Sequence, residues 1–280
     1  MDQRHAQEIL QRGRTVILIP FSTNLAQEIA GHFQRFLKEV SEDERARWSF
    51  NGEGNEDPDG SPDDGYIPRK GEMKGDGDRY DEKDIFHFRP RLLDFLKQND
   101  VNYEPWRPWL NKCLTLYRLC FGKEAELLLD IDRLKPGYDC LRQFVDLEAD
   151  QLHVLRIVQY VPHGSVDDNT VGKKHLDRNF LTFQIAESRP GLRYFPDGSD
   201  DPVVYKAQHD HVLAFPGRKF AKNTGGEVPA LAHDIVNVGE CDPTTGRWSV
   251  IFFGHIVEPL EETAHVAAAA SAAVAAAGQF

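Results

Sequence analysis

The segment His175-Leu176-Asp177 begins an apolar run, and its two polar residues are of types that bind metal ions. In an extended strand, residues i and i+2 point to the same face, so His175 and Asp177 can present an imidazole and a carboxylate together. A second pair with this spacing, His209 and His211, follows later in the chain. Such a pair alone is more often structural, so a metal site requires a third ligand from elsewhere.

His233 is the candidate for that third ligand. It lies 56 residues beyond Asp177 and begins another apolar run, HDIVNV. Two histidines and one carboxylate on one face of an ion leave open positions for reactants, which is the arrangement of non-haem Fe(II) sites that activate oxygen. We therefore expect His175, Asp177 and His233 to bind one metal ion. For His209 and His211 we expect a structural or exposed role.

Arg247 and Ser249 supply a second kind of chemistry. They open the run RWSVIFFGHIV, 14 residues beyond His233, and the two-residue spacing places them on one face of a strand. A guanidinium fork beside a hydroxyl is suited to holding a small carboxylate. The pair is therefore a candidate site for a small carboxylate.

The elements that must position these residues change in character along the chain. Residues 15–21 are expected to form a strand, and helical spacing follows from residue 22, at 90–97 and at 106–128. From about residue 152, seven or eight short alternating runs are separated by turn residues, which is typical of an all-β sandwich or barrel. We expect a helical region at 1–150, a catalytic β core at 151–260 and an alanine-rich tail at 261–280, effectively in one domain.

Residues 41–84 form a candidate flap. They contain 15 acidic and 7 basic residues and many Gly and Pro, so regular structure is not expected there. The segment is either a solvated loop or a flap over a pocket, with Tyr66 and Arg69 as possible substrate contacts. Its charge favours a cationic or amine-bearing substrate, although solubility explains the charge equally well.

Composition excludes several classes of protein. The net charge of −12 argues against general binding to nucleic acid or to an anionic membrane surface. Four cysteines without a CxxC pair do not suggest a disulfide framework or a thiolate zinc site, and they suit a reducing cytoplasm. No stretch is apolar enough to span a bilayer, and the tail is expected to be a frayed or surface helix. A small molecule is the expected partner, and the oligomeric state is not predicted.

Three segments in order, HLDRNFLT, LAHDIVNV and RWSVIFF, resemble the isopenicillin N synthase-like family of Fe(II)- and 2-oxoglutarate-dependent oxygenases. This family places an HxD pair, a later histidine and an RxS pair in the same order. The sequence around these motifs also resembles the family, in the segments LRIVQYVPHG, GLRYFPDG and PGRKFAKNTGG. The N-terminal half matches loosely, through its helix order and the stretch around GYIPRKGE.

The resemblance implies a mainly β fold, a double-stranded β-helix (jelly roll) with N-terminal helices packed on it. It implies Fe(II) at His175, Asp177 and His233, chelated by 2-oxoglutarate whose distal carboxylate is held by Arg247 and Ser249. With O2 as the other co-substrate, decarboxylation of 2-oxoglutarate drives oxidation of a C–H bond in a small molecule. Related halogenases lack the carboxylate ligand, so Asp177 favours hydroxylation, desaturation or cyclisation.

One stretch departs from the family pattern. Many plant members carry NYYP ahead of the iron ligands, and its second tyrosine contacts the co-substrate. This chain has Gln159-Tyr160-Val161-Pro162 instead. Gln159 and Tyr160 are therefore both candidates for contacting the keto acid.

Two other functions remain open from the sequence. One is an Fe(II)/O2 oxidase of the isopenicillin N synthase type, which uses no 2-oxoglutarate and keeps the RxS pair for a carboxylate of its substrate. The other is a jelly-roll binding protein without catalysis, which a complete ligand set argues against. The short chain and divergent N-terminal half suggest an enzyme of bacterial secondary metabolism, and the identity of the substrate is not predicted.

Overall fold

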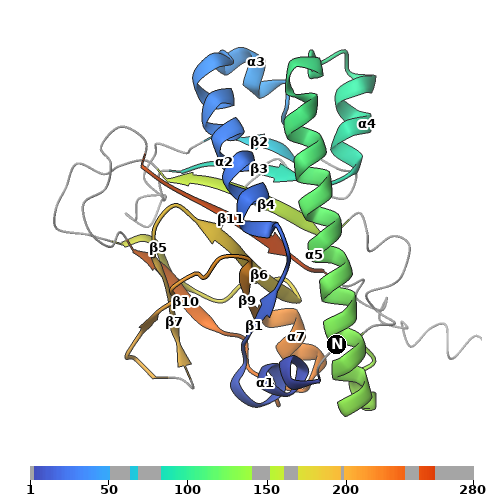
Figure 1. Cartoon of the computed structure of the whole chain (residues 1–280), viewed down its shortest axis with the longest axis vertical. Helices are drawn as coiled ribbons and strands as arrows, with labels where there is room; N and C mark the ends of the chain where they lie inside the picture. The colour runs from blue at the N-terminus through green and yellow to red at the C-terminus, as the bar shows by residue number, and fades with distance from the viewer. Residues whose placement is uncertain are drawn as a thin grey trace, which may run out of the picture.

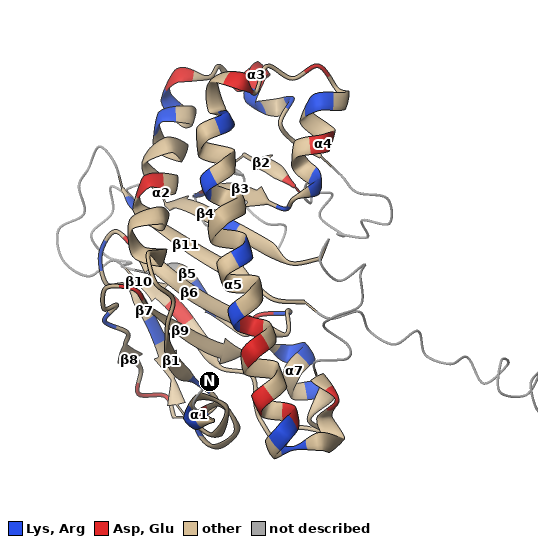
Figure 2. Cartoon of the chain, turned by 45° about the vertical axis from the view of Figure 1, so that its right-hand side comes forward, with Lys and Arg blue, Asp and Glu red and all other residues tan. Residues whose placement is uncertain are grey.

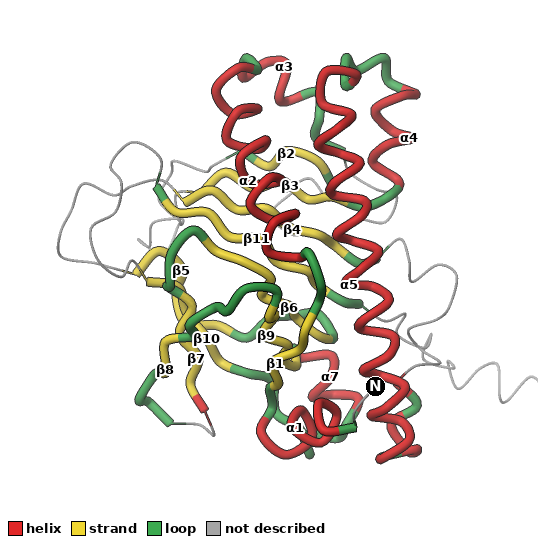
Figure 3. Tube along the Cα trace, in the orientation of Figure 1, coloured by secondary structure: helices red, strands yellow, loops and turns green. Residues whose placement is uncertain are grey.

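The strands of the protein form two antiparallel sheets that face each other, as a computed structural model shows (Figure 1). The described residues are 3–50, 64–68, 83–140, 152–160, 170–196, 199–236 and 246–255. Helices cover one side of the larger sheet (Figure 3). The result is a double-stranded β-helix with a helical layer, as expected from the sequence.

The larger sheet has seven strands in the order β1-β9-β6-β11-β4-β3-β2. Its central strands are β4 (Val154–Tyr160), β11 (Arg247–Phe253), β6 (Leu181–Glu187) and β9 (His211–Pro216). The N-terminal half supplies the edges, with β1 (Thr15–Leu18) on one side and β3 (Lys83–Phe88) and β2 (Gly65–Ile67) on the other.

The smaller sheet has four strands in the order β5-β10-β7-β8. These are β5 (Thr170–His175), β10 (Ala232–Val236), β7 (Leu192–Phe195) and β8 (Val203–Val204). From β4 to β11 the chain passes repeatedly between the two sheets. This winding brings strands that are distant in sequence, such as β5 and β10, side by side.

The helical layer consists mainly of α2 (Ser22–Glu39) and the long α5 (Arg107–Leu134), which pack on each other and on the large sheet. The other helices are α1 (Arg4–Arg12), α3 (Glu42–Ala46), α4 (Arg91–Gln98) and α7 (Arg218–Asn223), with short 3₁₀ turns at Glu104–Trp106 and Pro136–Tyr138. Charged residues lie along α2, α4 and α5, whereas the central strands are largely uncharged (Figure 2).

The alternation of side chains along the central strands produces two separate cores. On β11, Val250 and Phe252 belong to the core beneath the helices. Ile251 packs instead against the smaller cluster between the two sheets, which includes Val158 of β4 and Phe215 of β9. Because Arg247, Ser249 and Ile251 are two residues apart, they share the face that points between the sheets.

Several sequence expectations are confirmed, with changed bounds. The expected strand at 15–21 is β1, which ends at Leu18, and the expected helix at 106–128 is α5, which extends to Leu134. The helix α1 was not expected. The border between residues 150 and 151 stays a prediction, because it lies outside the described residues, as does the tail at 261–280.

The expectation of no regular structure at 41–84 is wrong for the described part of this segment. Helix α3 begins at a capping box, in which the Ser41 hydroxyl accepts from the Glu44 amide and the Glu44 carboxylate accepts from the Ser41 amide. Strand β2 pairs with β3 and extends the large sheet. Abundant Gly and Asp hid these short elements, since pairing to an existing sheet overrides weak local propensity.

Within the described part of the chain, no helix is both long enough and apolar enough to cross a membrane.

Candidate metal centre

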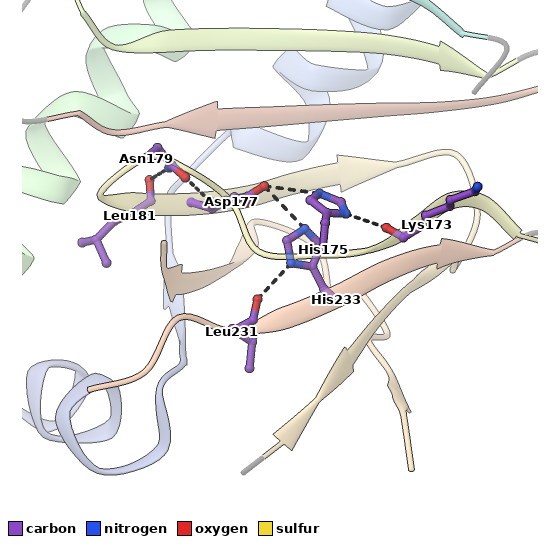
Figure 4. A network of polar contacts seen from close by, with 8 residues as sticks. Lys173, His175, Asp177, Asn179, Leu181, Leu231 and His233 are labelled. Carbon is purple, nitrogen blue, oxygen red and sulfur yellow. Dashed lines mark hydrogen bonds and ion pairs between the residues drawn. The ribbon is translucent and has the colours of Figure 1, made fainter. Parts of the chain in front are cut away.

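His175, Asp177 and His233 converge at one end of the small sheet (Figure 4). His175 ends β5, and His233 lies directly opposite it on β10, so the two imidazole rings have centroids 4.4 Å apart. An oxygen of Asp177 lies 3.4 Å from Nε2 of His175 and 3.7 Å from Nε2 of His233. All three ligand atoms lie within 4.8 Å of one another, and within the described residues they are the only His, Cys, Asp or Glu cluster able to hold a metal ion.

Backbone carbonyl groups orient both imidazoles. Nδ1 of His175 lies 2.6 Å from the carbonyl oxygen of Lys173, and Nδ1 of His233 lies 3.1 Å from that of Leu231. Because a carbonyl oxygen only accepts, each Nδ1 carries the proton and donates it. With Nδ1 as the donor, Nε2 of each neutral imidazole keeps the lone pair that a metal-binding histidine needs.

Thr182 holds the third ligand in place. Its hydroxyl donates to the second carboxylate oxygen of Asp177 at 2.6 Å and lies 3.1 Å from the side-chain oxygen of Asn179. Thr182 is buried in β6, on the sheet opposite β5. This hydrogen bond fixes one carboxylate oxygen of Asp177, and the other oxygen faces the Nε2 atoms of the two imidazoles.

The electrostatics of the group favour metal binding. Burial works against ionisation of Asp177, but a hydrogen bond with His175, the charges of His233 and His175, and the hydrogen bond from Thr182 lower its pKa to about 2. Burial lowers the pKa of His233, and the Asp177 carboxylate raises that of His175. At neutral pH the group thus offers an ionised carboxylate beside a neutral, buried imidazole, the forms in which these residues bind metals.

Two cavities border the ligands. An inner cavity of about 60 Å³ lies between the sheets and is lined by all three ligands, together with Tyr160, Thr182 and Gln184 among others. An outer cavity of about 610 Å³ also has His175 and Asp177 in its lining. A metal ion held here could accept one molecule from each cavity.

Arg247 and Ser249 both point between the sheets and are fully buried. The hydroxyl of Ser249 accepts from Gln184 at 3.0 Å. The Arg247 guanidinium lies 5.3 Å from the ring centre of Tyr160 and forms an ion pair with Glu187. Its Nε and Nη1 atoms are buried and have no hydrogen-bond partner among the described residues, so the guanidinium keeps donors for another acceptor.

The alternation of β4 separates Gln159 from Tyr160. Tyr160 lines the inner cavity, as a co-substrate contact should. Gln159 lies on the opposite face, where its side-chain oxygen accepts from Gln34 of α2 at 2.9 Å. Of these two candidates, the structure brings only Tyr160 to the metal centre.

Tyr66 does not lie at either cavity by the metal ligands. It is buried in the aromatic core beneath the helices, and its hydroxyl donates to Asp84 at 2.8 Å. Its position is structural, which corrects the expectation of a substrate contact. Arg69 lies outside the described residues.

The remaining histidine pair is separate from the centre. His209 is exposed, with Nε2 3.3 Å from the side-chain oxygen of Asn24, and Nδ1 of His211 lies 2.8 Å from the carbonyl of His209. Local contacts thus account for both residues, in agreement with the structural role expected for them.

Sequence reasoning missed three residues around the centre: Thr182, Glu187 and Arg156. Arg156 lines both cavities, and Glu187 contacts Arg247. Arg156 could have been found, since it shares the spacing of Val158 and Tyr160 on β4. Thr182 and Glu187 lie at the two ends of an apolar strand, where polar residues are common and carry no distinct signal.

No protein-family model matches the chain, and no curated protein sequence matches it. The solved structures that share its fold at low identity include proteins from three organisms described below. A protein of the 2OG-Fe(II) oxygenase family from Caulobacter crescentus has 20% identity and a TM-score of 0.66, over 91% of this chain and 82% of that one. A Neurospora crassa protein in complex with alpha-KG and thymine has 14% identity and a TM-score of 0.65, over 91% and 79%.

The third structure is dioxygenase for auxin oxidation 1 from Arabidopsis thaliana with bound 2-oxoglutarate. It has 14% identity and a TM-score of 0.63, over 91% of this chain and 88% of that one. At these identities the comparison establishes a shared fold. The fold of this chain is thus the double-stranded β-helix found among 2OG-Fe(II) oxygenases.

Proposed function

We propose that this protein is a non-haem Fe(II)- and 2-oxoglutarate-dependent oxygenase that oxidises a C–H bond of a small molecule. The observation that carries the proposal is the convergence of His175, Asp177 and His233 beside the inner cavity, with His175 and Asp177 also lining the outer one. Two Nε2 atoms and one carboxylate form the facial ligand set suited to Fe(II), with positions left for reactants. Bound Fe(II) with 2-oxoglutarate and O2 would supply the oxidation chemistry.

The residues of the chain position the reactants. Arg247 and Ser249 would hold the distal carboxylate of 2-oxoglutarate, with Tyr160 beside it, since two guanidinium nitrogens are buried and unpartnered there. Thr182 keeps Asp177 in its ligating orientation. Apolar residues between the sheets, among them Val158, Leu192 and Phe215, exclude water from the inner cavity.

The proposed family, cellular location and metabolic role of the protein rest mainly on its sequence. Membership of the isopenicillin N synthase-like family is supported by the order of the HxD, His and RxS motifs. A cytoplasmic location is supported by Cys113, Cys120 and Cys140, which are free and buried. A place in secondary metabolism is supported only by the divergent N-terminal half. A small-molecule partner, and no nucleic acid, fits the net charge of −12.

A second candidate function follows from the ion pair between Glu187 and Arg247. If Glu187 holds Arg247 permanently, no keto acid is anchored there. The protein would then be an Fe(II)/O2 oxidase that needs no 2-oxoglutarate. The two functions share the metal site and differ in the role of Arg247.

Anaerobic titration separates these functions. Fe(II) is added to the protein, followed by 2-oxoglutarate, and the visible metal-to-ligand charge-transfer band is recorded. We expect the band in the wild type, a large loss in Arg247→Ala, and no iron binding in His233→Ala. The control His209→Ala, a histidine outside the centre, should behave as the wild type. Iron binding without a band would favour the oxidase, and the absence of iron binding would refute both functions.

A further inference from the structure

The outer cavity has an unusual charge for a protein as acidic as this one. It is lined by four arginines, Arg89, Arg156, Arg178 and Arg218, and by His87 and His255. Among the described residues of its lining, the only acidic one is Asp177, which we assign to the metal. The chain as a whole has a net charge of −12, so this local excess of positive charge is not a property of the whole surface.

Within the part of the chain that the structure describes, three of the four arginines form no ion pair with a carboxylate. Arg89 forms an ion pair with Asp64, which also pairs with Arg91, so its charge is partly compensated inside the fold. Among the described residues, Arg156, Arg178 and Arg218 form no ion pair. Arg178 and Arg218 are exposed, and Arg156 is half-buried. Uncompensated cations around a concave site attract an anion, because the low-dielectric walls screen them less than water does.

Arg156 is the best placed of these cations. Its Nε donates to Nε2 of His87 at 2.7 Å, and its guanidinium carbon lies 4.5 Å from the ring centre of Phe253. These two contacts fix the guanidinium and leave its terminal nitrogens without a protein partner among the described residues. A guanidinium fixed in this way loses little conformational freedom when it binds a carboxylate or a phosphate.

Arg156 and Arg247 serve different ends of the space between the sheets. Arg247 lies opposite Tyr160 of β4, whereas Arg156 lies opposite Ile251 of β11. Four residues of strand separate the two positions, or about 13 Å. The metal ligands lie toward the Arg156 end, because Thr182, which bonds Asp177, pairs with Phe253. One acid anchored at Arg247 therefore leaves Arg156 for another molecule.

From this arrangement we infer that the primary substrate carries an anionic group, a carboxylate or a phosphate, which Arg156 binds while Arg178 and Arg218 attract it at the rim. The inference rests on the proposed function for the identity of the reaction, but the anion site itself can be tested without turnover. It replaces the sequence-based suggestion of a cationic substrate. That suggestion rested on the acidic segment 41–84, whereas the described lining of the cavity beside the metal is rich in arginine.

The test uses phenylphosphonate as the anionic probe and Mn(II) as the metal, since protein-bound Mn(II) shortens the ³¹P relaxation time of a nearby phosphonate. The probe is titrated into the Mn(II)-loaded protein with saturating 2-oxoglutarate, which fills the open metal positions, and again without it. The variants are Arg156→Gln and the exposed double variant R178Q/R218Q. The control is Arg107→Gln, which removes an exposed arginine paired with Glu104 on the distant helical layer.

We expect saturable relaxation in the wild type and in Arg107→Gln, and an affinity about tenfold weaker in Arg156→Gln and in R178Q/R218Q. The Fe(II)–2-oxoglutarate charge-transfer band should persist in all four proteins. If Arg156→Gln fails to fold, R178Q/R218Q decides, because its two residues are exposed.

Three results would overturn the inference. The first is the absence of saturable relaxation in the wild type, and the second is an unchanged affinity in the variants. The third is loss of the charge-transfer band in Arg156→Gln, which would show that Arg156 binds the co-substrate. If the wild type shows no charge-transfer band, the proposed function is refuted but the anion site is not. The phosphonate titration then still decides whether the anion site exists.

Discussion

Glu187 and Arg247 form an ion pair buried between the two sheets, at the position where a keto acid is expected to be anchored. Glu187 lies on β6 opposite Ser249 of β11, so its carboxylate reaches the guanidinium from the neighbouring strand. Burial raises the pKa of Glu187 even though the Arg247 charge works in the opposite direction. The anchor thus already holds an internal carboxylate, which an incoming acid must displace or share.

Glu187→Gln should strengthen the binding of 2-oxoglutarate. The amide is neutral and no longer competes with the ligand for the guanidinium, so we expect the affinity to rise about tenfold. The measurement is the dissociation constant from the anaerobic charge-transfer titration. Glu126→Gln, an exposed change that removes a pair with Lys123, is the control. Unchanged or weaker binding in Glu187→Gln would instead show that Glu187 orients Arg247 for the ligand.

Thr182→Val should weaken metal binding without removing a ligand. The variant keeps the shape of the side chain but deletes the hydrogen bond to Asp177, and losses of such supporting bonds typically cost about 10- to 100-fold in metal affinity. The measurement is competition with a chelator of known affinity. Thr115→Val, whose exposed hydroxyl donates to the Asn111 carbonyl on α5, is the control and should bind as the wild type. Wild-type affinity in Thr182→Val would contradict the role assigned to this residue.

The metal ligands were predictable because each is specified by local spacing. His175 and Asp177 share a face by the period of a strand, and His233 begins a strand of its own, so the order of motifs predicted their meeting on β5 and β10. The shared face of Arg247 and Ser249 on β11 was predictable for the same reason. For His175, Asp177 and His233 to meet, the fold had only to pair β5 with β10 so that His175 lies opposite His233.

The residues that surround these ligands could not be predicted in the same way. Glu187 reaches Arg247 only because β6 pairs with β11, and that pairing carries no signature in the sequence. Gln159 and Tyr160 are neighbours in sequence, and only the register of β4 decides that Tyr160 faces the inner cavity. The charge of the outer cavity comes from β4, the turn after β5 and α7, which the composition of 41–84 does not reflect.

Tyr66→Phe should reduce stability and leave the metal centre unchanged. The buried Tyr66 hydroxyl donates to the buried carboxylate of Asp84, and losing one donor to a buried acceptor costs about 1–3 kcal/mol in the free energy of unfolding. Denaturant unfolding gives the free energy, and the charge-transfer titration gives the affinity for 2-oxoglutarate. Tyr103→Phe, on the half-buried tyrosine ahead of α5, is the control. A changed affinity in Tyr66→Phe with normal stability would restore the sequence-based expectation of a ligand contact.

Glu124→Gln should stabilise the protein increasingly as the pH rises. Glu124 is fully buried within α5, its two oxygens have no hydrogen-bond partner among the described residues, and burial raises its pKa well above the usual value. The nearest imidazole, His153, lies 3.8 Å away, but its Nδ1 accepts from the His255 amide and burial lowers its pKa to about 3. His153 is therefore neutral and does not offset a charge on Glu124.

A carboxyl group whose pKa is raised in the folded state binds its proton more tightly there than in the unfolded chain. Its contribution is therefore favourable at low pH and is lost as the pH rises through the folded pKa. A neutral amide escapes this loss, so the difference in unfolding free energy between Glu124→Gln and the wild type should grow from acid toward alkaline pH, reaching about 1–3 kcal/mol. Thermal unfolding across this range, with Glu126→Gln on the exposed face of α5 as the control, measures the difference. A difference that is constant with pH, or a destabilised variant at alkaline pH, would show that Glu124 is ionised and paired with His153.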